Sequence, residues 1–473
     1  MAASKHRRAI RDLQSVTTLP ALPPQLAAFL LLNGIDPTEY RAASEALTSR
    51  FYRINPFPPS GRSVDTAMLA VQLGCAAAPV DWLPPGFFRV PNTTRLACTD
   101  AFARGDIYGM DASSAAAVYA LELAPGLDVL DLCCAPGTKL CLIADLLGRR
   151  GSLTGVDLSR HRLATCAQVL KKYGAAFARA PKPPAAAAVA RTTAPFGTGA
   201  SAGGGGDVVA YGSGSAGEGN TAAAAVVATA AAAPAAPAAT AASVAAEARL
   251  PLTSEWRCRL IEADGAALAL DGRGGVEALD QMHIVLDSQR LAELEPKFRT
   301  RRRKNKSWRA REKRAAKRAR LEAEAAPPRP PLPLEQYDRV LVDAECTHDG
   351  SLKHVAKLLL EDGDGAALVA RMLDPKRLRE LPALQRRLLR AGFRLLRPGG
   401  LLVYSTCSFA RAQNETVVAD LLESEPSAVE ERVPSPVAAT PYPARGGEPH
   451  GLRFDPLRSG TSGLFIARIR KTA

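Results

Sequence analysis

The sequence predicts an α/β protein with a largely parallel sheet that helices cover on both faces. Three observations lead to this fold class. From Leu127 onwards, short apolar runs alternate with helical segments, as in successive βαβ units. Several of these runs end in an acidic residue, at the sheet edge where such folds bind ligands. The chain of 473 residues is also long enough for two or three domains.

The expected elements follow one another in a regular order. Strands are expected at residues 128–132, 152–156, 259–264, 338–343, 401–405 and 463–469. Helices are expected between them, at residues 140–147, 160–173 and 382–391. Because ligands of such sheets bind at the carboxyl ends of the strands, the residues that follow the strands are the first candidates for a functional site.

The domain organisation follows from shifts in composition. Residues 1–110 mix short helical patterns with proline-rich turns and predict a small separate α+β domain. Residues 111–473 then form a second domain with two interruptions. Residues 175–250 are mostly Ala, Gly and Pro, which offer little apolar surface to offset the entropy lost on ordering, so we expect a disordered insertion. The second interruption, residues 297–330, is a basic insertion.

The net charge of +14 is concentrated in that second interruption. Residues 297–320 hold fourteen Lys and Arg and a single acid, Glu312, which accounts for +13 of the total. Such a run suits a phosphate backbone, a nuclear import signal, or both. The alternative is a solvated insertion with no specific role. We therefore expect a nucleic-acid partner and a nuclear or nucleolar location, with the cytoplasm or an organelle left open.

Cysteine spacing and hydropathy limit the classes of protein to which the chain could belong. Nine cysteines are scattered without a metal-type CxxC pair, so the sequence predicts no metal site and a reducing compartment. No apolar run reaches about 18 residues, which predicts that no segment spans a membrane.

The first candidate binding segment joins the strand at 128–132 to its helix. Its residues are Cys133, Cys134, Ala135, Pro136, Gly137, Thr138 and Lys139. A tight turn lets backbone N–H groups approach a ligand, and a helix start favours a carboxylate. Asp157 ends the second strand and could accept two ribose hydroxyls, while Asp264 ends the third and could accept from an adenine amino group. Each position could instead be an ordinary turn or cap, but together they favour a nucleoside-bearing cofactor.

Two cysteines follow the fourth and fifth strands. Cys346 comes shortly after Asp343, and Cys407 follows the strand at 401–405. Neighbouring parallel strands would bring both thiols to one edge of the sheet. A lone buried cysteine is usually a small hydrophobic residue, but two cysteines at a ligand edge, one of them beside an acid, indicate chemistry.

These stretches resemble the motifs of the Sun/Nop family of RNA (cytosine-5) methyltransferases. Residues 398–408 read PGGLLVYSTCS and are followed by Asn414-Glu415, which is similar to the family's PGGxLVYSTCS run and its ENE. Residues 131–139 resemble DxCAAPGGKT, and residues 343–350 resemble DAPCSGxG. Arg53-Ile54-Asn55 resembles the family's N-terminal RxN signature. The resemblance covers about residues 50–473 apart from the two insertions.

The resemblance implies a seven-stranded Rossmann-like methyltransferase domain that uses S-adenosylmethionine, behind an N-terminal RNA-contacting region at 1–110. It implies a monomer that acts on tRNA or rRNA. Cys407 would attack carbon 6 of cytosine, which makes carbon 5 nucleophilic enough to take a methyl group. Cys346 would assist release of the product, and Asp343 would hold the base beside the cofactor. Residues 133–139, Asp157 and Asp264 would bind S-adenosylmethionine.

Three departures from the family pattern carry further expectations. Glu345 replaces a proline, Thr138 replaces a glycine, and residues 347–350 replace SGxG. A carboxylate at Glu345 should raise the pKa of the Cys346 thiol by like-charge repulsion. His348 could act as an acid or base, but we expect it in a surface loop. Glu345 motivates the alternative of a catalytically inactive RNA-binding scaffold in ribosome assembly. A methyltransferase of DNA or of a small molecule is a further alternative.

Overall fold

The computed structural model describes residues 17–176, 256–268, 283–288, 337–362, 364–433 and 450–472. Nearly all of the predicted insertion at 175–250, and the whole of the basic insertion at 297–330, lie outside these ranges. In the described part of the chain, no helix is both long and apolar enough to cross a bilayer.

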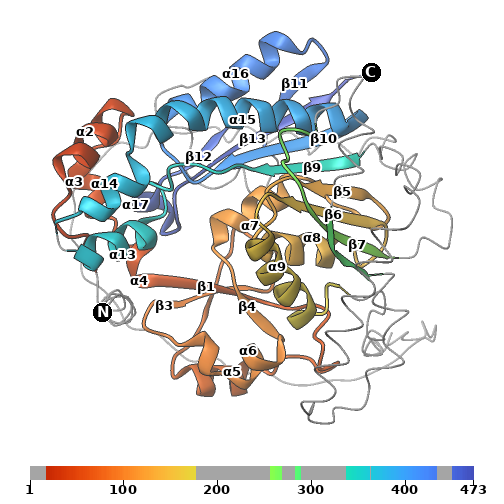
Figure 1. Ribbon diagram of the computed structural model, residues 1–473. Helices are drawn as coiled ribbons and strands as arrows, with labels where there is room; N and C mark the ends of the chain where they lie inside the picture. The colour runs from red at the N-terminus through yellow and green to blue at the C-terminus, as the bar shows by residue number, and fades with distance from the viewer. Residues whose placement is uncertain are drawn as a thin grey trace, which may run out of the picture. The chain divides into compact units, whose positions relative to one another are not determined.

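A nine-stranded sheet lies at the centre of the described chain (Figure 1). Its strands are β5 (Asp128–Asp131), β6 (Ser152–Asp157), β7 (Arg257–Glu262), β8 (His283–Asp287), β9 (Tyr337–Asp343), β10 (Leu396–Thr406), β11 (Ala428–Glu431), β12 (Leu452–Phe454) and β13 (Leu464–Lys471). The order is β11-β13-β10-β9-β5-β6-β7-β8, and β12 pairs with β13. The strands from β10 to β7 in this order are parallel neighbours, so their carboxyl ends share one edge.

The chain order reverses between β5 and β9. From β5 the chain runs outward through β6 and β7, and it returns to β9 and β10 on the other side. A doubly wound sheet binds its ligand at such a switch point. The Rossmann-like α/β class is therefore confirmed. The sheet has nine strands instead of the expected seven because antiparallel strands are added at its edges, such as β8 beside β7 and β11 beside β13.

Helices cover both faces of this sheet. One face packs against α7 (Ala112–Tyr119), α8 (Thr138–Leu146) and α9 (Arg160–Lys172), and the other against α15 (Pro375–Leu395) and α16 (Glu415–Ser424) (Figure 1). The expected helix at 382–391 begins earlier than predicted. Asp374 caps α15 by accepting from the Arg377 N–H at 2.8 Å, and Pro375 fits the first turn, where no N–H partner is needed.

A smaller antiparallel sheet precedes the large one. It has the order β2-β3-β1-β4, from β1 (Ser49–Ile54), β2 (Ala78–Pro79), β3 (Phe87–Pro91) and β4 (Ile107–Gly109). Beside it lie α5 (Thr66–Leu73), α6 (Asp100–Arg104) and the short 3₁₀ helix η1 (Leu96–Cys98). The predicted domain boundary at residue 110 stays a prediction, since the apolar core under α7 and α8 also contains side chains of the small sheet.

Short helices at the start of the chain pack elsewhere. The helices α2 (Pro24–Leu32), α3 (Pro37–Arg41) and α4 (Ser44–Thr48) share an apolar cluster with α13 (Leu352–Asp362) and α14 (Ala366–Met372) (Figure 1). Two further short helices, η4 (Arg411–Gln413) and α17 (Pro456–Ser459), flank the segment after β10 and the approach to β13.

The RxN segment joins the small sheet to the large one. The Arg53 guanidinium forms a buried ion pair with Asp145 of α8, and the Tyr108 hydroxyl donates to the same carboxylate at 3.1 Å. The Asn55 amide donates to the carbonyls of Gly105 at 2.9 Å and Tyr173 at 3.1 Å. This signature therefore has a structural role in the described chain.

We expect Arg53→Ala to destabilise the fold by about 3–5 kcal/mol, because it leaves the Asp145 carboxylate buried with weaker compensation. Urea unfolding followed by circular dichroism would measure the change. The control is Arg62→Ala, since Arg62 is exposed. Equal stability of the two variants would show that the ion pair is not needed.

Candidate active site

The two candidate cysteines meet at the carboxyl edge of the large sheet. Cys346 lies in the loop after β9, and Cys407 directly follows β10. The two strands are parallel neighbours, with Asp343 opposite Ser405. As a result, the Sγ atoms of Cys346 and Cys407 are 3.4 Å apart. The expected proximity of the two thiols is present, and all nine cysteines of the chain are free.

His348 is a third member of this cluster, and its expected place in a surface loop is wrong. Its Nδ1 lies 3.0 Å from Cys407 Sγ and 3.7 Å from Cys346 Sγ. Its φ of 61° is in the left-handed region, which a side chain other than glycine rarely adopts and which costs on the order of 1–3 kcal/mol. The family pattern has glycine here. The sequence thus contained a sign of this site: an imidazole at a glycine position, two residues after a candidate cysteine.

The three groups strongly influence one another's protonation. Burial raises the pKa of the Cys346 thiol, but hydrogen bonds with Cys407 and His348 outweigh burial and lower that pKa to about 6. The hydrogen bond with Cys346 raises the pKa of His348. The same neighbour raises the pKa of the Cys407 thiol well above its ordinary range. The cluster therefore favours one thiolate and one imidazolium beside a second, protonated thiol.

The expectation that Glu345 raises the pKa of Cys346 is wrong. The Glu345 side chain is 46% exposed, and its Oε1 lies 2.8 Å from Nη1 of Arg377. Arg377 also donates to the Cys346 carbonyl at 3.1 Å. The glutamate charge is therefore balanced by a cation and screened by solvent. The thiol responds to its nearest partners, Cys407 and His348, and its pKa falls.

Asp349 holds the two cysteine loops together, which the sequence did not reveal. It is fully buried, and its carboxylate accepts hydrogen bonds from Thr347 Oγ1, from Ser408 Oγ at 2.9 Å and from the Phe409 N–H at 2.7 Å. The next residue, Gly350, donates its N–H to the Cys407 carbonyl at 2.8 Å. This network fixes the segment after Cys346 against the segment after Cys407.

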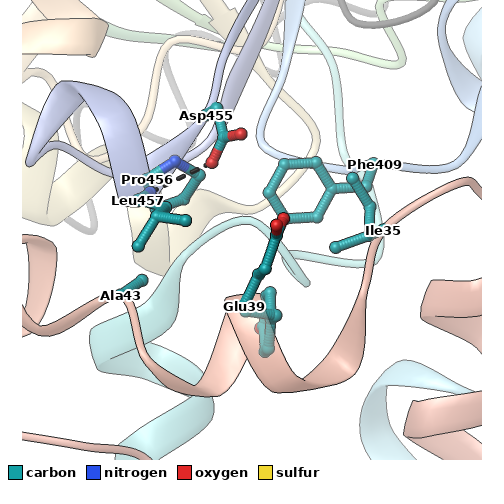
Figure 2. Close-up of a pocket in the computed structure, with 8 residues that line it drawn as sticks. Ile35, Glu39, Ala43, Phe409, Asp455, Pro456 and Leu457 are labelled. Carbon is teal, nitrogen blue, oxygen red and sulfur yellow. Dashed lines mark hydrogen bonds between the residues drawn. The ribbon is translucent and has the colours of Figure 1, made fainter.

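The N-terminal helices support the same loop from behind. The Tyr40 hydroxyl donates to the Asp349 carbonyl at 2.6 Å, and its ring meets Phe409 edge-on with centroids 6.1 Å apart. Figure 2 shows a hollow beside these rings, lined by Ile35, Glu39, Tyr40, Ala43, Phe409, Asp455, Pro456 and Leu457. No nucleophilic thiol is among its lining residues, so we interpret it as a packing hollow between α3, α17 and the loop after β10.

Asp343 connects the cysteines to the candidate cofactor turn. One carboxylate oxygen lies 2.7 Å from Lys139 Nζ, and the other accepts from Ser405 Oγ at 2.7 Å. Burial lowers the pKa of Lys139, but Asp343 outweighs it and raises that pKa. Asp131 ends β5 nearby, and burial together with the Asp343 charge raises its pKa to about 7. The predicted residues Asp343 and Lys139 therefore form a direct contact.

In the turn at 133–139, the backbone at the start of α8 is not covered by a side chain. Gly137 has φ of 103°, and a Cβ there would lie 2.7 Å from Cys166 Sγ, so no other residue fits without movement. Thr138 begins α8, and Pro136 is exposed. The side chains of Cys134 and Ala135 are buried, which leaves their backbone as the part that could reach a ligand. Cys133 is partly buried and donates its N–H to Asp131 at 3.2 Å.

The two remaining predicted acids differ in their surroundings. Asp157 ends β6 and is 4% exposed; it accepts from the Ser159 N–H at 2.9 Å. The N-cap of α9 is Ser159, so Asp157 is not the helix cap. Asp264 lies two residues beyond β7 because that strand ends at Glu262, and it is exposed and accepts from the Ala266 N–H at 2.9 Å. Both follow neighbouring parallel strands and so lie toward one edge of the sheet.

An open cleft adjoins Glu345 along the first turns of α15. Its lining residues are Glu345, Asp374, Lys376, Arg377, Glu380, Leu381, Ala383, Leu384 and Arg387. The helix α15 carries seven Lys and Arg and one Glu. The lining itself carries three basic and three acidic side chains. Because Arg377 also contacts the Cys346 carbonyl, the cleft begins directly beside the cysteine cluster.

Comparisons with known proteins agree with this geometry. Residues 118–180 and 324–470 match the family described as 16S rRNA methyltransferase RsmB/F. Ribosomal RNA small subunit methyltransferase F of Cronobacter sakazakii is 37% identical over 140 residues, which are 29% of this chain and 26% of that protein. Its namesake in Escherichia coli O9:H4 is 35% identical over 143 residues, 29% of this chain and 26% of that protein. The chain thus matches about a quarter of the length of these relatives.

The likeness to a solved structure concerns the fold. The chain titled PH0851 is 17% identical, with a TM-score of 0.51, and the alignment covers 96% of this chain and 69% of that chain. The family match confirms the predicted resemblance to the Sun/Nop family, and the likeness to the solved structure agrees with the Rossmann-like class.

We expect Asp131→Asn to stabilise the cofactor-free protein more at pH 8 than at pH 5. The pKa of about 7 exceeds that of an unfolded aspartate, so folding favours the protonated form, and the stability from this group is lost as pH rises through 7. Asparagine removes that loss, at most about 4 kcal/mol. Urea unfolding at both pH values would measure it, with the exposed Asp81→Asn as the control. A gain of the same size at pH 5 would contradict the assignment.

Proposed function

Since the chain shares its catalytic-domain segments with the RsmB/F family of rRNA methyltransferases, we propose that it is an RNA (cytosine-C5) methyltransferase. The observation that carries this proposal is the pair of thiols, Cys346 and Cys407, 3.4 Å apart beside Asp343 at the switch point of the sheet. A pair of thiols suits a reaction in which one adds to the base and the other serves its release.

The residues at the sheet edge fit S-adenosylmethionine. The turn at Gly137 has no side chain, and a Cβ there would collide with Cys166. This turn and the start of α8 suit the binding of a carboxylate. Asp157 suits the ribose hydroxyls, and Asp264 suits the adenine amino group. The remaining residues of 133–139 would complete the site together with Asp343. When bound, S-adenosylmethionine supplies the methyl group for carbon 5.

The chain's own residues carry the covalent steps. The Cys407 thiolate forms a bond to carbon 6 of cytosine, and the electron pair displaced from the 5,6 double bond makes carbon 5 nucleophilic. Asp343 holds the ring edge and helps to localise the charge of this adduct. Once carbon 5 carries the methyl group, its proton passes to a water molecule, the electron pair of that bond re-forms the double bond, and Cys407 is expelled as a thiolate. Cys346 assists this release.

His348 is placed to manage the proton of the nucleophile. Its imidazolium, with Nδ1 3.0 Å from Cys407 Sγ, stabilises the thiolate that forms there, and the Cys346 thiolate, 3.4 Å from the same sulfur, takes the proton as the attack begins. The Cys346 thiol formed in this way can return that proton as Cys407 leaves. In this proposal, the imidazole compensates for the high pKa of the Cys407 thiol.

The proposed substrate is RNA whose target base is unstacked. The names of the relatives favour rRNA, and tRNA is the other candidate. The cleft beside Cys346, along the basic helix α15, and the N-terminal region at 1–110 are the proposed contact surfaces. A monomer and a nuclear or nucleolar location stay predictions; the latter rests on residues 297–320, which lie outside the described residues.

The reason for considering a catalytically inactive RNA-binding scaffold no longer holds. It rested on a disturbance of Cys346 by Glu345, and Glu345 instead pairs with Arg377 while the pKa of Cys346 is lowered. The thiols, Asp343 and Lys139 keep mutual contacts that a binding scaffold would not need.

We expect Cys407→Ala to reduce methyl transfer to total RNA by at least about a thousand-fold, because it removes the attacking atom. We expect Cys346→Ala to accumulate a protein–RNA adduct that survives denaturation, because release is impaired. Transfer of labelled methyl groups and denaturing electrophoresis measure the two effects. Cys98→Ala is the control, since Cys98 is exposed. Full activity of Cys407→Ala would reject the proposed nucleophile.

We expect the pair Lys376→Glu and Arg387→Glu to weaken RNA binding and leave the binding of S-adenosylmethionine unchanged. Both side chains are exposed and line the cleft, and each phosphate that the cleft no longer neutralises should lower the salt dependence of binding by about one unit of slope. Fluorescence anisotropy over a salt series measures the slope. Arg150→Glu, at another exposed position, is the control. An unchanged slope would exclude the cleft as the RNA surface.

A further inference from the structure

We propose that Cys346, His348 and Cys407 form a site for a thiophilic divalent metal ion, Zn²⁺ first, which reversibly blocks the enzyme. The binding rests on the geometry of the three side chains. Its inhibitory consequence rests on the proposed function, in which Cys407 is the nucleophile.

The three donor atoms are already near the positions that a metal needs. Both Sγ atoms and the imidazole Nδ1 lie within 4.8 Å of one another. The separations are 3.4 Å between the sulfurs, 3.0 Å from Nδ1 to Cys407 Sγ and 3.7 Å from Nδ1 to Cys346 Sγ. In a tetrahedral zinc site, bond lengths of about 2.3 Å to sulfur and 2.0–2.1 Å to nitrogen place neighbouring ligand atoms about 3.5–3.7 Å apart. Shifts of about half an ångström would therefore suffice.

The backbone around the site keeps the ligands together. Cys346 and His348 come from one loop and Cys407 from the next strand end, and the Gly350 N–H donates to the Cys407 carbonyl at 2.8 Å. The buried Asp349 carboxylate also bonds groups of both segments. Little of the binding energy is therefore spent on ordering the ligands. His348 supplies the third ligand from a left-handed backbone position, where the family's glycine would leave only two thiols.

The ligand set selects the kind of ion. Two thiols and an imidazole prefer Zn²⁺, Co²⁺ or Cd²⁺ to Mg²⁺, Ca²⁺ or Mn²⁺, which prefer oxygen ligands. The nearby Asp343 carboxylate is engaged by Lys139 and Ser405. Three protein ligands leave a fourth position for water, as in open zinc sites. His348 and Cys407 are only partly buried, so an ion could enter from solvent.

Metal binding would compete directly with the attack on cytosine. Each thiol that binds releases its proton to solvent, its sulfur lone pair forms the bond to the ion, and no electron is transferred. A Cys407 sulfur held in this way cannot add to carbon 6. A chelator would remove the ion and return the free thiols. The sequence did not reveal this site, because its ligands stand at positions i, i+2 and 61 residues beyond the first, without a CxxC pair.

The first experiment is a titration of the full chain with Co²⁺ under anaerobic, reducing conditions. We expect one ion per chain, with thiolate-to-metal charge-transfer absorption that one equivalent of Zn²⁺ abolishes. His348→Gly keeps a residue suited to the left-handed backbone and both thiols, and we expect it to weaken Zn²⁺ binding at least about 10-fold. Cys407→Ser should remove part of the charge-transfer band. The controls are His161→Gly and Cys98→Ser, at exposed positions.

Two results would overturn the site: Co²⁺ absorption without a thiolate band, or Zn²⁺ affinity that is unchanged in both His348→Gly and Cys407→Ser. The regulatory part is tested by methyl transfer with stoichiometric Zn²⁺ and then with EDTA. Inhibition that EDTA reverses supports it, and unchanged activity with the ion bound rejects it. If the metal-free protein transfers no methyl group, the proposed function and the inhibition that depends on it both fail, while the absorption data still decide the metal site.

Discussion

The parallel pairing of β9 with β10 is the constraint on which the site depends. It sets Asp343 opposite Ser405, and the two loops that follow these residues then emerge side by side. Every close contact of the cluster follows from this register, including the 3.4 Å between the sulfurs and the hydrogen bond from Ser405 to Asp343. A slip of one residue would turn one of the two side chains to the opposite face of the sheet. Beyond the strand ends, β9 and β10 are no longer hydrogen-bonded to each other. There the hydrogen bonds of the buried Asp349 and of Tyr40 hold the loops in place.

Polar groups buried at helix ends link the N-terminal region to this site. The contacts of Arg53 and Asn55 reach α8 and the end of α9, the helices that begin after the cofactor turn and after Asp157. The two sheets therefore share polar partners as well as an apolar core. The helix α8 therefore carries both Asp145, the partner of Arg53, and the start of the candidate cofactor site at the Gly137 turn.

The central sheet could be predicted well from the sequence, because the spacing of apolar residues along a strand and the residue types at strand ends are local properties. The strand at 128–132, the acid at Asp157 and both cysteines could be placed from a few residues each. The start of α15 was wrong because Pro382 was taken as its beginning, whereas Asp374 caps the helix two turns earlier. The role of Glu345 was wrong because a charge next to Cys346 in sequence was assumed to be next to it in space. Arg377, on a different element, decides where that charge is balanced. Asp349 was missed, and the acid or base role of His348 was ranked below a surface position, for the same reason: their importance comes from partners about 60 residues away.

The short distances among Cys346, His348 and Cys407 suit the proposed covalent chemistry and also suit the binding of a metal ion. A nucleophile needs a base within hydrogen-bond distance, and its release needs a second thiol near the same carbon, so the chemistry requires three groups with lone pairs in one small volume. Those are also the requirements for holding a soft metal ion. A glycine in place of His348 would remove the imidazolium beside the two thiols and leave a weak metal site, whereas the histidine strengthens both properties together. The left-handed backbone at His348 costs stability, which a loop fixed by Asp349 can tolerate. In this chain, the proposed reactivity and the proposed metal sensitivity therefore have a single structural origin.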